Sequence, residues 1–178
     1  MAAPTSSQIA SFGPPISPFE RAKKPDHQKV VHEAHANRDA FESKIHDARD
    51  DGHPAFPKPT AFATTDQIQR IINKDLEASE RRRICYLWVI NDQGINMLWE
   101  GIENLSDPVE KKVKHTNITG GGKAYHGGEV FFSDTKKIYV NNKSDRYGWS
   151  SNQQWDAVVS YFREVYSQFE VIDIRDEI

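Results

Sequence analysis

The chain has 178 residues, a formal net charge of −3 and a single cysteine, Cys85. This charge argues against a general electrostatic grip on nucleic acid, and one cysteine excludes an internal disulfide and a cysteine-based zinc site. Cys85 lies in an apolar run, so we expect a buried structural thiol. No apolar stretch reaches the roughly 18 residues that a membrane span needs, and the first residues lack the pattern of a signal peptide. We therefore expect a cytoplasmic protein, and secretion without a cleaved leader is compatible with this sequence.

Residues 1–60 are predicted to form a flexible, Pro-rich arm with few large aliphatic side chains. Prolines are frequent up to residue 25, where they remove backbone donors and fix φ, so we expect extended or disordered backbone there. From about 27 to 50 a thin apolar stripe predicts one amphipathic helix that needs a partner surface. The stripe consists of residues three or four positions apart: Val31, Ala34, Arg38, Phe41, Ile45 and Ala48.

Residues 61–178 are predicted to form one compact domain. Thr64 and Gln67 fit a capping box at the start of its first helix. The basic cluster 81–83 is expected at a helix end, where cations complement the helix dipole. The run Ile84–Ile90 is rich in β-branched and aromatic residues without alternation, which is typical of a central strand buried on both faces. After a short polar turn, the next apolar segment completes a hairpin with that strand.

Three further strands are predicted in close succession, followed by a helix and a closing strand. The three strands are Lys112–Ile118, Ala124–Phe132 and Lys137–Asn142. A second capping box, Ser151 with Gln154, opens a helix with a wide apolar face, and the alternating segment Glu170–Ile174 is expected as an edge strand. We therefore predict an α+β fold, in which an antiparallel sheet of about five to six strands carries helices mainly on one face.

Two short connections determine the predicted register of these strands. A hairpin centred on the glycines at 121 and 122 places His115 opposite Gly128 or Glu129. A second hairpin, centred on residues 135 and 136, places Glu129 opposite Asn142. Directly opposed residues share a sheet face, so these side chains are predicted to form one polar row. Further polar residues follow at its end: Ser144, Asp145, Arg146 and Tyr147.

The predicted row has the composition of an acid–base site. A carboxylate beside an imidazole raises the pKa of the imidazole and fixes its tautomer, as a general base requires. We therefore predict His115, Glu129 and Arg146 as catalytic residues, with Arg146 as a bidentate clamp for phosphate or carboxylate. The predicted substrate-binding residues are Thr116, Asn142, Ser144 and Tyr147. The alternative is a solvated polar sheet face, in which a His–Glu pair contributes about a few tenths of a kcal/mol.

Two glycine clusters bear on ligand binding. The segment Gly120–Lys123 lacks the G-x-x-x-x-G-K-[ST] spacing of a phosphate loop, and no helix is predicted directly after it, so we expect a flexible hairpin tip. Gly127 and Gly128 lie inside a predicted strand, which indicates either a bulge or a close backbone approach by a ligand. We predict no metal site and no cofactor.

Four segments in this order resemble an uncharacterised bacterial domain family. They are residues 114–117 (KHTN), 127–129 (GGE), 138–142 (IYVNN) and 144–147 (SDRY). In that family a KHTN-like strand, a GGE strand and a Ser-Gly-Arg/His-Tyr segment precede a helix and a terminal strand. The resemblance covers roughly residues 84–174 and departs from the pattern at Asp145, where the family has Gly. It implies a toxin-like or effector setting, since such domains also stand at the ends of bacterial toxin-like chains, and it implies no particular activity.

Three classes of function compete. The first is a toxin-like or effector enzyme acting on a nucleotide or other phosphate-bearing substrate, with His115 as acid/base, Glu129 as its orienter or the base itself, and Arg146 as the anion clamp. The second is a non-enzymatic binding or assembly module that docks on a protein partner through the arm 1–60. The third, sequence-specific nucleic-acid binding, is disfavoured by the acidic balance and the lack of a recognisable motif. We expect neither a nucleic-acid nor a membrane partner.

Overall fold

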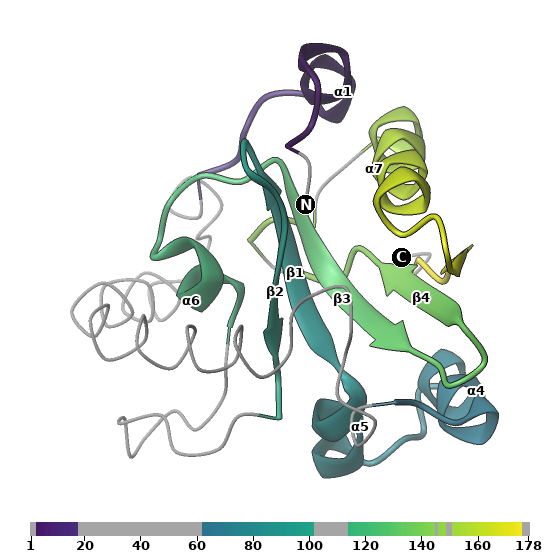
Figure 1. The fold of residues 1–178 in the computed structure, drawn as a ribbon. Coiled ribbons are helices and arrows are strands. Elements are labelled where there is room, and N and C mark those ends of the chain that lie inside the picture. The colour runs from purple at the N-terminus through teal and green to yellow at the C-terminus, as the bar shows by residue number, and fades with distance from the viewer. Residues whose placement is uncertain (1–2, 18–61, 102–113, 145, 149–150, 176–178) are drawn as a thin grey trace.

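The structure is a computed structural model that describes residues 3–17, 62–101, 114–144, 146–148 and 151–175. A five-stranded mixed sheet lies at the centre of the described fold (Figure 1). The strands are β1 Tyr86–Asn91, β2 Gly94–Trp99, β3 His126–Phe132, β4 Lys137–Asn141 and β5 Glu170–Asp173. Their order in space is β2-β1-β3-β4-β5. The first four pair antiparallel, and β5 runs parallel to β4. The predicted α+β fold is confirmed, and the purely antiparallel sheet is wrong at its last strand.

The connection between β4 and β5 explains their parallel pairing. It contains α7, Asn152–Val165, which opens on the predicted capping box of Ser151 and Gln154. A helix of 14 residues carries the chain back along the sheet, so the following strand can run in the same direction as β4. Alternation in the sequence identifies such a strand but carries no information about its direction.

Helices cover both faces of the sheet. Besides α7 they are α1 Ser6–Phe12, α4 Thr65–Ile72, α5 Ala78–Ile84 and α6 His115–Thr119. Trp88 and its neighbours two positions away share a core with α7 and α1, whereas Leu87 packs with residues of α4 and α5 on the opposite face. Figure 1 shows α7 to the right of the sheet and α6 to its left. The expectation of helices mainly on one face is therefore wrong, while the central strand buried on both faces is confirmed.

The N-terminal segment contributes to the core. Thr5 and Gln8 form a capping box at the start of α1, and Phe12 at its end is 1% exposed. Ile16 then pairs with Ala124 through two backbone hydrogen bonds of 2.7 and 3.1 Å. The expectation of extended or disordered backbone over residues 1–25 is thus wrong for α1, because the local capping signal outweighs the surrounding prolines.

Other predictions for the arm fall outside the described part of the chain. The helix expected from about 27 to 50 lies within residues 18–61, and the domain boundary at residue 61 stands at the end of that segment. Both stay predictions. Among the described helices, none has the length and apolar character that crossing a bilayer demands.

Two connections differ from the predicted hairpins. Residues 115–119 form α6 instead of part of a strand, and the glycines after it cap the helix, since Gly120 and Gly121 have φ of 63° and 81°. The β3–β4 turn has three residues instead of two, with Lys136 at φ 59°. Glu129 therefore lies opposite Asn141, one position from the predicted Asn142.

Candidate functional site

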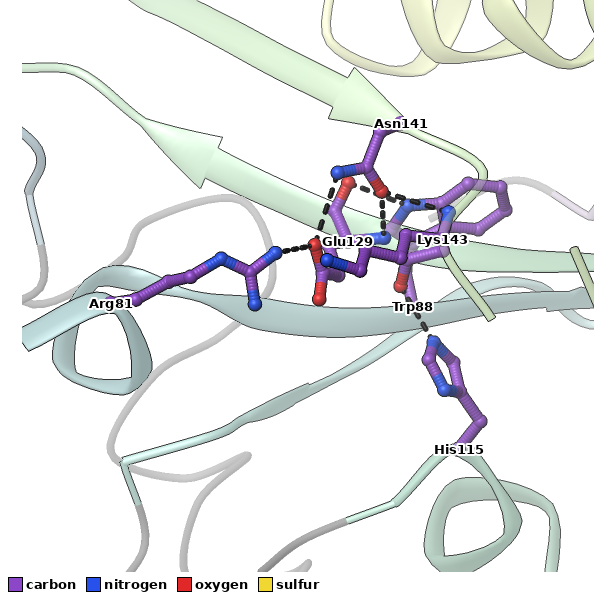
Figure 2. A network of polar contacts seen from close by, with 7 residues as sticks. Arg81, Trp88, His115, Glu129, Asn141 and Lys143 are labelled. Atoms are coloured by element: carbon purple, nitrogen blue, oxygen red, sulfur yellow. Dashed lines mark hydrogen bonds and ion pairs between the residues drawn. The ribbon is translucent and has the colours of Figure 1, made fainter. Parts of the chain in front are cut away.

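A buried carboxylate, Glu129 of β3, is the centre of a polar network on the α4–α6 face of the sheet (Figure 2). Its side chain forms an ion pair with Arg81 of α5 and accepts a hydrogen bond of 3.0 Å from the amide nitrogen of Asn141. The amide oxygen of Asn141 in turn accepts hydrogen bonds of 3.0 Å from the backbone nitrogens of Glu129 and Lys143. Because these contacts involve backbone as well as side chains, they fix the carboxylate relative to the end of β4.

The ion pair is largely removed from water. The side chain of Arg81 is 21% exposed and that of Glu129 is 7% exposed. The Arg81 guanidinium also lies over the ring of Phe131, 5.6 Å from its centroid. Burial lowers the pKa of Arg81, but the combined effects of Glu129, Cys85 and Glu100 outweigh it, so the pKa is raised overall. Arg81 therefore stays charged and balances the buried carboxylate.

Cys85 and Glu100 lie beside this pair. Their ligand atoms and those of Glu129 fall within 4.8 Å of one another, a spacing that a metal ion can use. Burial raises the pKa of the Cys85 thiol well above its usual range, and the carboxylates of Glu129 and Glu100 raise it further. Burial likewise raises the pKa of Glu100. A neutral thiol is a poor metal ligand, and Arg81 already supplies the positive charge that Glu129 requires, so we assign this group to the core. The buried thiol predicted from the sequence is confirmed.

His115 reaches the same face by a different route from the predicted one. It is the first residue of α6, and its Nε2 lies 2.7 Å from the backbone oxygen of Gly128. A carbonyl only accepts, so Nε2 carries the proton in this contact. A Cβ at Gly127 would lie 3.4 Å from the His115 ring, which places the ring on the Glu129 side of β3. Figure 2 shows His115 directed at the backbone of β3, while Arg81 and Asn141 are directed at the carboxylate of Glu129.

Of the other predicted site residues, Thr116 lies in α6 and the rest follow β4. The side-chain amide of Asn142 donates to the backbone oxygen of Gly148 at 3.3 Å. The hydroxyl of Ser144 accepts from the backbone nitrogen of Tyr147 at 3.1 Å. Arg146 is 8% exposed and Thr116 is 3% exposed. The structure therefore brings His115 and Glu129 to one side of the sheet and gives Asn142 and Ser144 contacts that stabilise the turn.

Tyr147 lies in the interior. Its side chain is 0% exposed, and its hydroxyl donates to the backbone oxygen of Gly122 at 2.7 Å and lies 3.0 Å from the hydroxyl of Thr119. Substrate binding by this side chain, as predicted from the sequence, would require the ring to leave this position. The space beside Gly127 and Gly128 is likewise filled by the protein itself. A Cβ at Gly127 would meet Tyr147, and a Cβ at Gly128 would meet the backbone of Asn141.

The buried hydroxyl of Tyr147 predicts an alkaline limit to stability. Burial raises the pKa of Tyr147 to about 12, from about 10 in the unfolded chain. A raised pKa contributes stability that is complete below pH 10 and is lost as the pH rises to about 12, a loss of roughly 2 kcal/mol. We expect Tyr147→Phe to weaken the fold by about 1–2 kcal/mol at pH 7 and to show a shallower decline between pH 10 and 12. Urea unfolding at a series of pH values measures both effects, and equal slopes for the two proteins would contradict this assignment.

A cavity of about 590 Å³ opens beside the ion pair. Its polar lining consists of Lys74, Arg81, Asn141, Lys143, Asp173 and Arg175. Its apolar lining consists of Ile71, Ile72, Leu76, Ala78 and Ile174. Asn141 and Asp173 are the last residues of the parallel strands β4 and β5. The cavity therefore opens at the carboxyl ends of the one parallel pair of strands in the described sheet.

Sequence reasoning missed two residues of this site. The basic cluster 81–83 predicts only cations at a helix end, yet Arg81 turns inward and forms the ion pair with Glu129. The predicted row contains Asn142 instead of Asn141, because the predicted pairing of β3 with β4 differs from the observed one by one residue. The sequence does contain a signal for Arg81. A carboxylate on a sheet face that a helix covers requires a cation, and the basic helix end at 81–83 can supply it.

Comparison with known proteins gives no further assignment: the chain matches no protein-family model, no curated protein and no solved structure.

Proposed function

We propose that the domain binds, and acts on, a phosphate-bearing small molecule held in the cavity beside Arg81. The observation that carries this proposal is the charge of the lining, which contains four cationic residues, Lys74, Arg81, Lys143 and Arg175, and one acidic residue, Asp173. Of these, Arg175 donates a hydrogen bond to Asn152, and Asp173 accepts one from Trp155. Cations that converge on a concave surface attract anions, and guanidinium groups suit phosphate oxygens. The toxin-like or effector setting implied by the sequence resemblance is part of this proposal and rests on that resemblance alone.

Binding is supported more directly than catalysis. The carboxylate of Glu129 is engaged by Arg81 and Asn141, so it acts as a base only after a ligand draws Arg81 away. In this proposal Glu129 positions Arg81, and Arg81 with Lys143 takes the anion-clamp role first given to Arg146. His115 lies on the same side of β3 but does not line the cavity, so its predicted role of general acid/base requires a substrate that extends beyond the cavity.

Titration with inorganic phosphate tests the binding step. We expect saturable amide shift changes at residues around the cavity, because the probe carries the charge that the lining attracts. Lys143→Gln should weaken the affinity about tenfold, since it removes one charged contact. Lys123→Gln, which changes an exposed lysine outside the lining, is the matched control and should stay within twofold. Equal affinities for the two variants, or no saturation, would contradict the proposal.

His115 allows the binding and reaction steps to be separated. It is not among the residues that line the cavity, so His115→Ala should leave the phosphate affinity within about twofold. Loss of the cellular effect of the protein with retained affinity would assign His115 to the reaction. Loss of both the effect and the phosphate affinity, in a protein that remains folded, would show that His115 contributes to binding.

Docking on a protein partner through the arm 1–60 stays the alternative. The packing of α1 changes its test, because deletion of residues 1–60 would also remove Phe12 from the core. Substitution within the predicted stripe, Phe41→Asp with Ile45→Asp, leaves α1 intact. Association that survives this double substitution would count against the docking function.

A further inference from the structure

Residues 3–17, which we call the α1 segment, contact the domain in the manner of a bound peptide. They consist of α1 and a short extended end, and the residues from 18 to 61 separate them from the next described part of the chain (Figure 1). All five strands of the sheet lie between residues 86 and 173. The sheet therefore does not need the α1 segment for its strands, and the segment packs on a surface that the domain already presents.

Phe12 is the main anchor of the α1 segment. Its ring lies among three aromatic rings of the domain, with centroids 5.9 Å from Tyr125, 6.2 Å from His126 and 5.6 Å from Tyr161. The backbone oxygen of Phe12 also accepts a hydrogen bond of 2.8 Å from Nε2 of His126, whose side chain is buried. A buried polar group of the domain is thus directed at the backbone of the segment, so the domain contacts the peptide chain as well as the ring.

Contacts on either side of this anchor fix the direction of the segment. After α1, Ile16 and Ala124 exchange backbone hydrogen bonds of 2.7 and 3.1 Å, which is the pairing by which an extended peptide adds to a sheet. Before the anchor, the side-chain amide of Gln8 donates to the carboxylate of Glu164 in α7 at 2.7 Å. We call the surface that receives the segment the α1 site, and it consists of Ala124, Tyr125, His126, Tyr161 and Glu164.

A second copy of the chain presents the same segment to the same site. The contacts of the α1 site are noncovalent, so none of them requires both partners to belong to one chain. The residues from 18 to 61 span at most about 150 Å when extended, which permits the segment to reach a neighbouring copy. Exchange of an identical element between copies is a common route to dimers, because it reuses contacts that the single chain already makes.

We infer that the α1 site is an interaction surface for a second copy of this chain, whose α1 segment docks there in place of the resident one. Phe12 of the incoming segment is the anchor, and the pairing of Ile16 with Ala124 sets its register. The resident segment competes at an effective concentration on the order of 1 mM, so exchange increases with protein concentration and when the resident segment is weakened. This inference is independent of the phosphate site.

Disulfide cross-linking of full-length chains tests the inference. Residues that exchange both backbone hydrogen bonds have Cα atoms about 5.5 Å apart, a separation that suits a disulfide, so Ile16→Cys and Ala124→Cys form a suitable pair. We expect a concentrated mixture of the two single variants to give a disulfide-linked heterodimer on a non-reducing gel. A single chain that carries both substitutions should form the internal bond, which verifies the geometry. The native Cys85 is buried and should not compete.

Phe12→Ala should have opposite effects in the two chains. In the Ile16→Cys chain it removes the anchor of the incoming segment, so the yield of heterodimer should fall at least about fivefold. In the Ala124→Cys chain it weakens the resident segment instead, so the yield should rise by about the same factor. Ala10→Cys, at an exposed position of α1, replaces Ile16→Cys as the control for random encounter and should give little heterodimer.

A second variant of the Ala124→Cys chain keeps the test decisive if Phe12→Ala prevents that chain from folding. Thr5→Ala with Gln8→Ala removes the capping box and the contact with α7 but no buried side chain, and it should also raise the yield.

Three outcomes would overturn the inference. The first is no heterodimer from a mixture of single variants when the chain with both cysteines does form its internal bond. The second is a heterodimer whose yield does not respond to Phe12→Ala in the Ile16→Cys chain, since the encounter would then be unrelated to the α1 site. The third is a doubly substituted chain that stays reduced, because the pairing that defines the site would then be wrong.

Discussion

Arg81→Met is expected to destabilise the domain by about 3–5 kcal/mol, because it removes the cation from a buried ion pair and leaves the carboxylate of Glu129 uncompensated. Glu129 is 5% exposed, so water cannot replace the lost partner. The remaining hydrogen bond from Asn141 stabilises the charge only in part. Equilibrium unfolding in urea at pH 7 gives the change in the free energy of unfolding.

A double substitution distinguishes loss of the charge balance from loss of packing. Replacing both partners, Arg81→Met with Glu129→Leu, removes the buried charge as well as its cation, so most of the stability should return. Arg83→Met changes an exposed arginine of the same helix and should stay within about 0.5 kcal/mol. If Arg81→Met alone costs less than about 1 kcal/mol, the pair is solvated and the site is not organised by it.

Local signals in the sequence predict individual elements of this fold well. The two capping boxes at Thr64 and Ser151 are present as predicted, because a cap depends on residues only three positions apart. The run after Ile84 is a strand buried on both faces, because its composition reflects burial directly. A capping box at Thr5 existed in the sequence as well, and the prolines around it concealed the helix that it opens.

Register and direction are set by features that span longer distances. A left-handed Lys136 lengthens the β3–β4 turn by one residue and moves Asn141, not Asn142, beside Glu129. Such a conformation is rare outside glycine and gives little warning in sequence. For His115 the predicted element is wrong, because the residue lies in a helix and not in a strand. The predicted position on the same side of the sheet as Glu129 nevertheless agrees with the structure. The pairing of Glu129 with Arg81 joins positions 48 residues apart, and no local pattern specifies a contact of that kind.

Gly128→Ala is expected to prevent stable folding, with a loss of at least about 3 kcal/mol. A Cβ at this position would lie 2.0 Å from the backbone oxygen of Asn141 and 2.9 Å from the ring of Trp88. Neither neighbour can move freely, since Asn141 is hydrogen-bonded in the Glu129 network and the Trp88 indole donates to the backbone oxygen of Glu129 at 3.0 Å. Urea unfolding and the indole proton resonance of Trp88 report the effect.

The same substitution distinguishes approach of a ligand to the paired glycines from close packing of the protein against them. If Gly128 existed to let a ligand approach the backbone, Gly128→Ala would fold normally and lose only binding. The contact with Asn141 instead predicts a folding defect, with Gly127→Ala less severe because its closest neighbour is the Cβ of Tyr147 at 2.8 Å. Gly122→Ala, whose nearest contact is the backbone oxygen of Thr119 at 3.1 Å, is the matched control and should cost less than about 1 kcal/mol. A folded Gly128→Ala protein with an unchanged Trp88 resonance would refute the close packing of β3 on β4, on which the position of Glu129 beside the cavity depends.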